Sequence, residues 1–324
     1  MMQARQVGID VSKLTLNTAF RDASGCWQDG KFSNDEDGFQ RLSAWAGSDS
    51  IFTMEATGRY HVNLASFLYR DKHRVNVSNP LQVKRFCQMQ FRRTKTDRAD
   101  ARMIAEFAVF NGSVLTAWQP SDAGLAEAQS LQTAVRLLIV HCTAMNNCIQ
   151  ALRLTDAGRK AALALAKILR SERKLIKVME AEIAKLVSVS YKEEYQCAMS
   201  IPSVGTKTAA AVILATGGLA LFDSSKQLSA YFGMSPRQFQ SGTSINGKGH
   251  ICKMGNPHVR ALLYMCSVSS LRHNKVCKDF YDSLVAKGKP KKVAMMAVAN
   301  KLLRIIFAVM KSKTPWNPEV AAAH

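Results

Sequence analysis

The sequence predicts a chain that begins as a mixed α/β domain and continues almost entirely as helix. Three observations over its 324 residues predict this order. Short apolar or alternating segments recur through residues 5–80, as half-buried strands do. Residues 121–201 contain no proline and are rich in Ala, Leu, Lys and Glu. Beyond Pro202 the apolar spacing is again helical, apart from a Gly- and Ser-rich stretch at residues 233–256.

The first 80 residues predict five strands and two helices. The strands are expected at residues 7–11, 14–20, 26–32, 51–54 and 74–78. Asn34 or Asp35 caps the first helix, which runs to Trp45 and ends at Gly47. The second helix is expected over residues 58–72. Three strands followed by helix, strand, helix and strand match a ribonuclease-H-like fold, although other α/β folds share parts of this order.

The middle of the chain predicts two or more long helices with a break near residues 156–158. An amphipathic stripe favours a helical spacer or a coiled-coil arm that positions domains or pairs protomers. The stripe comprises Leu169, Leu175, Ile176, Met179, Ile183 and Leu186. A late amphipathic helix is expected at residues 294–310, and a frayed tail at 314–324. We therefore expect domains at residues 1–118, 119–199 and 200–324.

Charge points to a polyanionic partner. Lys and Arg total 44 against 24 Asp and Glu, a net charge of +20. Residues 200–324 carry 17 basic and 4 acidic side chains, whereas residues 1–120 carry 16 and 12. The 47% hydrophobic content excludes wholesale disorder. Neither a signal peptide nor an apolar run of membrane-spanning length is expected, so the sequence predicts a cytoplasmic protein without a membrane partner.

The eight cysteines contain no CxxC pair, so neither a zinc site nor a disulfide framework is indicated. Four acids stand out instead. Asp10 ends the first strand, Glu55 ends the fourth, and Asp97 and Asp100 begin a later helix with both carboxylates on one face. In a ribonuclease-H-like sheet these strands are neighbours, so the four carboxylates would meet and need a cation such as Mg²⁺. The alternatives are a helix-cap or first-turn role for Asp97, a turn cap for Asp10 and a solvated Glu55.

Residues 201–217 resemble a helix-hairpin-helix element that grips a nucleic-acid backbone. Gly205 lets the backbone come close to a phosphate, and Lys207 lies beside the turn. An ordinary packing corner between helices is the alternative.

The acid-free stretch at residues 235–260 reads as a flexible loop that carries hydroxyl groups among cations. Such a loop suits a nucleophile that attacks a phosphodiester. Ser241 is the first candidate, Ser235 and Ser244 are less favoured, and a plain Ser-Gly loop is the alternative. The expected phosphate contacts here are Arg237, Lys248, Lys253 and Arg260, while His250 and His258 would contact phosphate or pack.

A basic stretch at residues 84–93 interleaves cations with aromatic rings. Its members are Lys84, Arg85, Phe86, Phe91, Arg92 and Arg93. Cations and aromatics together favour single-stranded or structured nucleic acid, and a solvated basic helix face is the alternative.

Taken in order, these motifs resemble the IS110 family of insertion-sequence transposases and the related Piv-type DNA invertases. The resemblance rests on VGIDVSK, EATGRY, KTDRADARMIAEF, IPSVGTKTAA and SPRQFQSGTS, and covers residues 5–313. It implies a RuvC-like domain in which Asp10, Glu55, Asp97 and Asp100 bind Mg²⁺. It further implies a coiled-coil arm and a transposase domain with Ser241 as the catalytic serine.

In that family the serine forms a covalent 5′-phosphoserine link with DNA. The resemblance implies donor and target DNA as substrates, a bridge RNA as guide, and a homo-oligomer between dimer and tetramer. We expect the acids and Ser241, about 140 residues apart, to act together only when domains close on DNA. The alternatives are a Piv-type invertase, a hydrolytic RuvC-like nuclease with an idle serine, and a non-catalytic nucleic-acid-binding protein.

Overall fold

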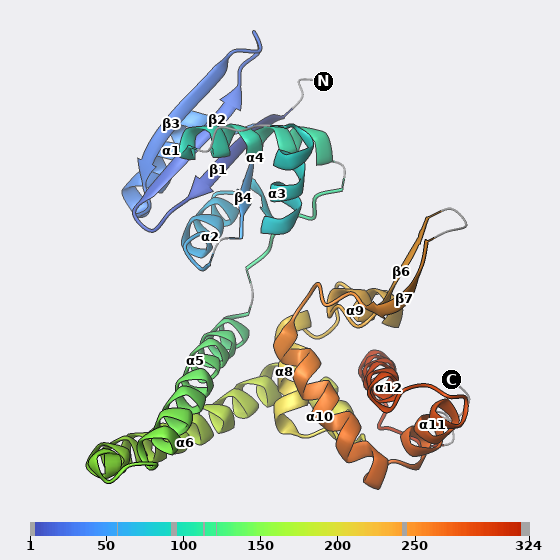
Figure 1. Ribbon diagram of the computed structural model, residues 1–324. Helices are drawn as coiled ribbons and strands as arrows, with labels where there is room; N and C mark the ends of the chain where they lie inside the picture. The colour runs from blue at the N-terminus through green and yellow to red at the C-terminus, as the bar shows by residue number, and fades with distance from the viewer. Residues whose placement is uncertain are drawn as a thin grey trace. The chain divides into compact units, whose positions relative to one another are not determined.

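The computed structural model divides into two compact units, Met1–Pro120 and Ser121–His324 (Figure 1). It describes residues 4–56, 58–91, 96–112, 114–120, 122–241 and 245–318, with the backbone alone at 238–241 and 245–249. The first unit is α/β and the second is almost wholly helical. The predicted mixed fold, with an N-terminal sheet and a helical C-terminal part, is therefore confirmed.

The first unit is built on a five-stranded sheet with the order β3-β2-β1-β4-β5. Strand β2 is antiparallel to its neighbours, whereas β1, β4 and β5 are parallel. This is the ribonuclease-H-like arrangement that the element order predicts. The strands are β1 (Arg5–Val11), β2 (Thr15–Arg21), β3 (Trp27–Ser33), β4 (Ser50–Glu55) and β5 (Arg74–Ser78).

Four helices accompany this sheet: α1 (Glu36–Ala46), α2 (Val62–Arg70), α3 (Pro80–Met89) and α4 (Asp97–Asn111). Asp35 caps α1 by accepting a hydrogen bond from the Gly38 backbone N–H, and Gly47 ends that helix at φ 84°, both as predicted. Helix α2 begins later than expected, because residues 58–61 form turns. Apolar residues of α1, α2 and one face of β1 share a core that includes Leu42, Leu64 and Ile9.

Helix α4 packs directly on β1 at Gly8. A Cβ atom at Gly8 would lie 2.2 Å from the backbone N of Ala105 and 2.3 Å from the backbone O of Ala101. Both contacts are to helix backbone, so no side-chain rotation could relieve them. Only glycine therefore permits this separation between strand and helix.

Replacing Gly8 with alanine should force α4 away from the sheet. We expect the free energy of unfolding to fall by about 3 kcal/mol, the upper end of the usual cost of overpacking. Urea titration followed by circular dichroism would measure it. Gly25→Ala is a control in the same unit with no neighbouring atom within 4 Å, although its positive φ adds a small strain. Equal losses in the two variants would contradict the close approach.

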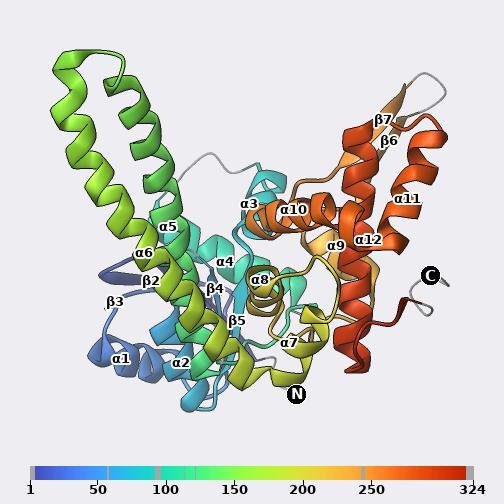
Figure 2. The same ribbon diagram turned by 90° about the horizontal axis from the view of Figure 1, so that it is seen from below.

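The second unit begins with two long helices, α5 (Ala123–Leu152) and α6 (Arg159–Ser190), separated at the predicted break by a short 3₁₀ turn, Asp156–Gly158. They lie side by side in Figures 1 and 2. Buried residues recur every seven positions on both helices, at 128, 135, 142 and 149 and at 162, 169, 176 and 183. This is the spacing of helices that pack along one seam. Leu175, which we expected in the stripe, is 49% exposed instead.

The remaining helices surround one apolar core with the base of the α5–α6 pair. They are α7 (Lys192–Met199), α8 (Thr206–Thr216), α9 (Ser225–Tyr231), α10 (Pro257–His273), α11 (Lys275–Ala286) and α12 (Lys291–Ser312). Within the described residues only α12 is long and apolar enough to cross a membrane. Half of that apolar window is buried inside the protein, as in a core helix.

Two expectations about irregular segments are wrong. Strands β6 (Pro236–Ser241) and β7 (Ile245–Ile251) pair as an antiparallel hairpin where a flexible loop was expected, and residues 242–244 between them lie outside the described ones. The tail is also ordered as far as Trp316, whose backbone N–H donates to Ser200 Oγ at 2.7 Å. The partly buried Trp316 ring packs against the core and holds this segment in place. Residues 319–324 lie outside the described ones, so the frayed tail expected there stays a prediction.

Candidate functional site

Asp10 and Glu55 occupy neighbouring positions at one edge of the sheet. The strand register pairs Ile9 with Met54, and each acid is the next residue of its strand. Ile9 and Met54 are buried in the core that also contains α1 and α2. Because side chains alternate along a strand, Asp10 and Glu55 both lie on the opposite face, the face on which Gly8 contacts α4.

Helix α4 runs antiparallel to β1. Near its start, Arg98 and Arg102 bind Asp29, which pairs with Ala19 of β2. Further along, Glu106 accepts a hydrogen bond from Arg21, two residues beyond Ala19 on the same strand. Since β2 is antiparallel to β1, the first turn of α4 lies toward the end of β1 that carries Asp10.

The first turn of α4 continues the helix face that covers the sheet. Asp97 precedes by four residues Ala101, which contacts Gly8 of the sheet, whereas Asp100 precedes by four Ile104, which is buried in the cluster shared with α3. Thr96 is the N-cap, since its side chain accepts from the Ala99 backbone N–H at 3.2 Å. The cap role considered for Asp97 therefore belongs to its neighbour, and Asp97 is an exposed acid of the first turn.

The fold thus directs four carboxylates toward one end of the sheet. In the described part of the chain, no group of three or more Asp, Glu, His or Cys side chains is placed to hold a metal ion. The donors are nevertheless of the right kind, because Mg²⁺ binds oxygen and in nucleic-acid enzymes takes one or two carboxylates together with substrate phosphates. The residues therefore suit a site that phosphate completes.

Ion pairs that the sequence did not reveal hold the start of α4 against β3. Asp29 of β3 accepts hydrogen bonds from Arg98 Nε and Arg102 Nε, each at 2.8 Å. Arg102 also lies over the Trp27 ring, 5.2 Å from its centroid. The hydrogen bond from Arg102, followed by that from Arg98, lowers the pKa of Asp29 from 3.8 to about 2. Asp29 is 18% exposed and Arg102 25%, whereas Arg98 is 68% exposed, so solvent screens the Arg98 pair more than the Arg102 pair.

Replacing Asp29 with asparagine should destabilise the first unit by about 1–2 kcal/mol at pH 7. The pKa of Asp29 is lowered in the folded state, so its contribution is complete above the unfolded pKa and is lost as the pH falls from about 4 to 2. Unfolding curves of both proteins across this range would measure the effect. Wild type and variant should converge at the acid end, and a constant difference would contradict the ion-pair origin.

Ser241 is the last residue of β6, and its backbone pairs with Ile245 of β7. The side chains of Ser241 and Lys248 lie outside the described ones, as does the whole of Ser244. The base of the hairpin is tightly built: a Cβ at Gly233 would lie 2.3 Å from the Met254 carbonyl oxygen. Ser241 therefore lies at the end of β6 away from this base, four residues beyond the exposed Arg237.

The cations expected around this stretch have different surroundings. Lys253 is exposed and adopts a positive φ of 59° at the hairpin base. Arg260 donates from Nη1 to the Phe232 carbonyl oxygen at 2.9 Å, so part of its guanidinium supports the chain. Burial, and then the charge of Arg136, lowers the pKa of His258, which favours packing over a role as a phosphate-binding cation. His250 is exposed.

In the α7–α8 turn, the backbone of Gly205 is accessible, whereas Lys207 forms an ion pair within the unit. A Cβ at Gly205 would meet nothing within 4 Å, so a ligand could approach this backbone. Lys207 Nζ instead lies 2.7 Å from Glu180 Oε1 of α6, an acid only 18% exposed. The lysine that we expected beside a phosphate is thus paired within the unit, a partner that sequence spacing does not reveal.

The basic stretch near α3 divides into core and surface. Phe86 is 7% exposed and packs against Phe107, so it cannot serve as a stacking platform as we expected. Phe91 is 90% exposed, and Lys84 and Arg85 are exposed on α3. Arg92 and Arg93 lie outside the described residues.

Two family models match the chain. A model described as "Transposase", of the DEDD type, matches residues 7–157 and thus covers the sheet with all four acids. A model described as "Transposase IS116/IS110/IS902 family" matches residues 195–282, which include the α7–α8 turn and the hairpin. The two matches fall on different units of the structure except where the first extends into α5.

Several curated proteins are similar along the chain. A "Pilin gene-inverting protein" of Moraxella bovis is 28% identical over 98% of this chain and 99% of its own length. A "Probable family 20 transposase" of Pseudomonas aeruginosa is 25% identical over 98% and 100%. A "Transposase for insertion sequence element IS1111A" of Coxiella burnetii is 37% identical over 36% of this chain and 33% of its own length.

Proposed function

Because the chain belongs to the IS110 family of transposases, we propose that it cuts and rejoins DNA through a covalent bond between Ser241 and a 5′ phosphate. The family makes it an enzyme of DNA recombination and transposition, with DNA as substrate. The observation that carries the proposal is the placement of Asp10 and Glu55 on adjacent strand ends beneath the first turn of α4. We assign the first unit to phosphate-metal binding and the serine hairpin of the second to nucleophilic attack.

The four carboxylates would hold Mg²⁺ together with DNA phosphate oxygens. When bound, the metal neutralises charge on the phosphate that is attacked and on the oxygen that leaves. Asp10 and Glu55 supply oxygens from the sheet, while Asp97 and Asp100 supply them from α4. In nucleic-acid enzymes Mg²⁺ takes ligands from substrate phosphates as well as from carboxylates.

The serine would act as nucleophile. Its Oγ attacks the phosphorus atom, the bond to the 3′ oxygen breaks, and the serine proton passes to solvent or a nearby base while the 3′ oxygen leaves as a hydroxyl. Attack by another strand's 3′ hydroxyl then reverses the step and releases Ser241. Arg237 and Lys253 are exposed near the hairpin base, at the opposite end of β6 from Ser241, so they would hold the DNA backbone.

We propose the remaining features by family membership. A bridge RNA would pair with donor and target DNA. The α5–α6 arm would contact other protomers in a dimer or tetramer. The α7–α8 turn would bind the nucleic-acid backbone. We further propose domain limits of 1–118, 119–199 and 200–324, with action in the cytoplasm at the nucleoid. Sequencing of RNA that co-purifies with the protein would test the guide.

A second candidate is a site-specific DNA invertase. Full-length similarity to a protein named for pilin gene inversion favours it. The two reactions share the same chemistry and differ in the arrangement of sites. A plasmid that carries an inverted pair of element ends would reveal inversion, whereas one that carries the element and a separate target would reveal transposition.

The covalent intermediate is the test of the proposal. Protein incubated with labelled DNA and Mg²⁺ should yield a protein–DNA adduct that survives denaturing electrophoresis. Digestion and mass spectrometry should place the phosphate on Ser241. A hydrolytic nuclease would instead leave free 5′-phosphate ends and no adduct, and a non-catalytic binding protein would leave the DNA intact.

A further inference from the structure

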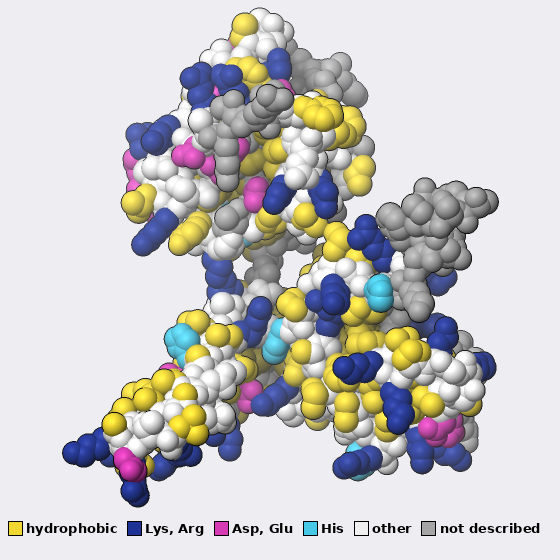
Figure 3. Space-filling model, in the orientation of Figure 1, with side chains coloured by type: hydrophobic (Ala, Val, Ile, Leu, Met, Phe, Trp, Pro, Cys, Tyr) yellow, Lys and Arg dark blue, Asp and Glu magenta, His cyan; other side chains and the backbone are white. Residues whose placement is uncertain are grey.

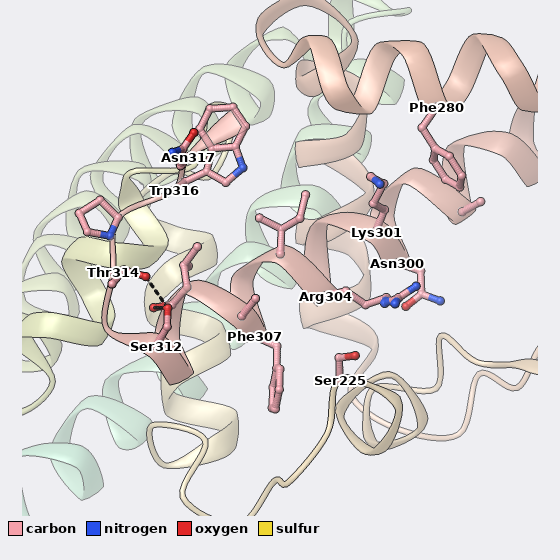
Figure 4. A pocket seen from close by; sticks show the side chains of 15 residues that line it. Ser225, Phe280, Asn300, Lys301, Arg304, Phe307, Ser312, Thr314, Trp316 and Asn317 are labelled. Carbon is pink, nitrogen blue, oxygen red and sulfur yellow. Dashed lines mark hydrogen bonds between the residues drawn. The ribbon is translucent and has the colours of Figure 1, made fainter. Parts of the chain in front are cut away.

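The second unit contains a groove that takes no part in the proposed reaction. It has a volume of 870 Å³ and lies along one face of α12, between α9, α11 and the segment 314–317 (Figure 4). The floor is largely apolar, and none of the described residues that line it is acidic. The groove lies in the C-terminal third of the chain, which carries 17 basic and 4 acidic residues. Figure 3 likewise shows many Lys and Arg and few Asp or Glu on this unit.

The hydrogen-bond donors that line the groove include Asn300, Lys301 and Arg304. Ser229, which is 4% exposed, donates from its hydroxyl to Asn300 Oδ1 at 2.7 Å, so the Asn300 amide is oriented and its nitrogen remains a donor. Arg304 is exposed and makes no ion pair with any described acid. Lys301 Nζ lies 5.2 Å from the centroid of the Phe280 ring. Donors without a facing acid favour an anionic ligand.

Aromatic rings are distributed among these donors. Phe280 comes from α11, Phe307 from α12 and Trp316 from the tail segment, and Figure 4 shows all three lining the groove. The hydrogen bond from the Trp316 backbone N–H to Ser200 Oγ fixes the tail at one end. Flat rings beside cations bind nucleobases by stacking while the cations take the phosphates.

We propose that this groove binds unpaired nucleotides of a nucleic-acid strand. A volume of 870 Å³ lies within the range of small-ligand sites and exceeds the needs of a single ring. Bases of a duplex are covered by their stacking partners, so the aromatic groove selects unpaired ones. Unpaired DNA and unpaired RNA share this chemistry. The proposal does not depend on Ser241 or on the acids, since it concerns binding and not strand cleavage.

The test compares two charge reversals on one helix. Arg304→Glu changes a residue of the groove, whereas Lys311→Glu changes an exposed lysine of α12 that does not line it. Both change the net charge equally, and neither alters the core. Fluorescence anisotropy would measure binding of oligothymidylate, oligouridylate and a DNA duplex by the full-length protein. Arg304→Glu should weaken single-strand binding about tenfold more than Lys311→Glu does. Duplex binding should fall equally in the two variants.

A second measurement tests stacking. Oligonucleotides with 5-iodouridine or its deoxy form should cross-link under ultraviolet light to Phe280, Phe307 or Trp316, and Phe307→Leu should reduce the yield. The better of the two probes identifies RNA or DNA as the ligand. Equal effects of the two charge reversals on every probe, or cross-links only elsewhere, would overturn the proposal. The proposal would also be overturned if Arg304→Glu changed the sedimentation mass of the protein but not its affinity for oligonucleotides, because the groove would then bind a second copy of the chain.

Discussion

Replacing Ser241 with alanine should abolish recombination and the covalent adduct together. We expect the rate of strand exchange to fall at least about a thousandfold, because no other group can replace the lost nucleophile. The hairpin should survive, since β6 and β7 pair through their backbones. DNA binding by the variant should stay within about twofold of wild type, because binding is set by the cations and not by a neutral hydroxyl.

Denaturing electrophoresis with labelled DNA would measure the adduct, and quantitative amplification of the new junction would measure exchange. Ser235→Ala is the matched control, because Ser235 precedes the same strand and its backbone oxygen accepts from Cys252 regardless of side chain. Retention of cleavage by Ser241→Ala, with free 5′-phosphate ends, would assign the chemistry to hydrolysis.

Replacing Asp10 with asparagine should cause a comparable loss, and Glu55→Gln should do the same. Each change keeps the shape of the side chain but removes a charge that would hold Mg²⁺. We expect strand cleavage to fall at least about a thousandfold in each variant, and the double variant to lose little more, since residues that act as a unit are not additive.

Binding of Mn²⁺ measured by paramagnetic resonance, with a short DNA present, gives a readout independent of cleavage. Asp22→Asn is the control, because this acid lies in the β2–β3 turn and hydrogen-bonds Ser24 and Gln28 locally. Full Mn²⁺ binding by Asp10→Asn would contradict the metal role and leave the serine proposal standing.

Local signals predicted most of the first unit. The Asp35 cap and the Gly47 stop are each encoded within a few residues, and the structure has both. The strand order was expected instead from the succession of elements along the chain, which matches a ribonuclease-H-like fold. The two acids at strand ends could be placed because parallel neighbours end at the same edge. Asp29 could not be assigned a role, because its partners Arg98 and Arg102 lie 69 and 73 residues away.

The second unit shows where composition misleads. Glycines and serines suggested a flexible loop at residues 235–260, yet β6 and β7 pair there, and pairing is set by the partner strand more than by propensity. Likewise, the sequence suggested that Lys207 binds phosphate, but the lysine forms an ion pair with Glu180 of α6. The amphipathic stripe at residues 169–186, in contrast, was visible locally: Leu169, Ile176 and Ile183 are buried, although Leu175 is exposed.

The pairing of α5 with α6 constrains how whole molecules can associate. Each helix already fills its inner seam with the other, so a neighbouring molecule cannot insert a helix there without unfolding the pair. The outer surface still displays Leu137, Val140 and Val178, which are 57%, 64% and 65% exposed. Association through these helices would therefore join two folded α5–α6 pairs into a four-helix bundle. Changes on the outer surface would then alter assembly without altering folding, so evolution could adjust the two properties separately.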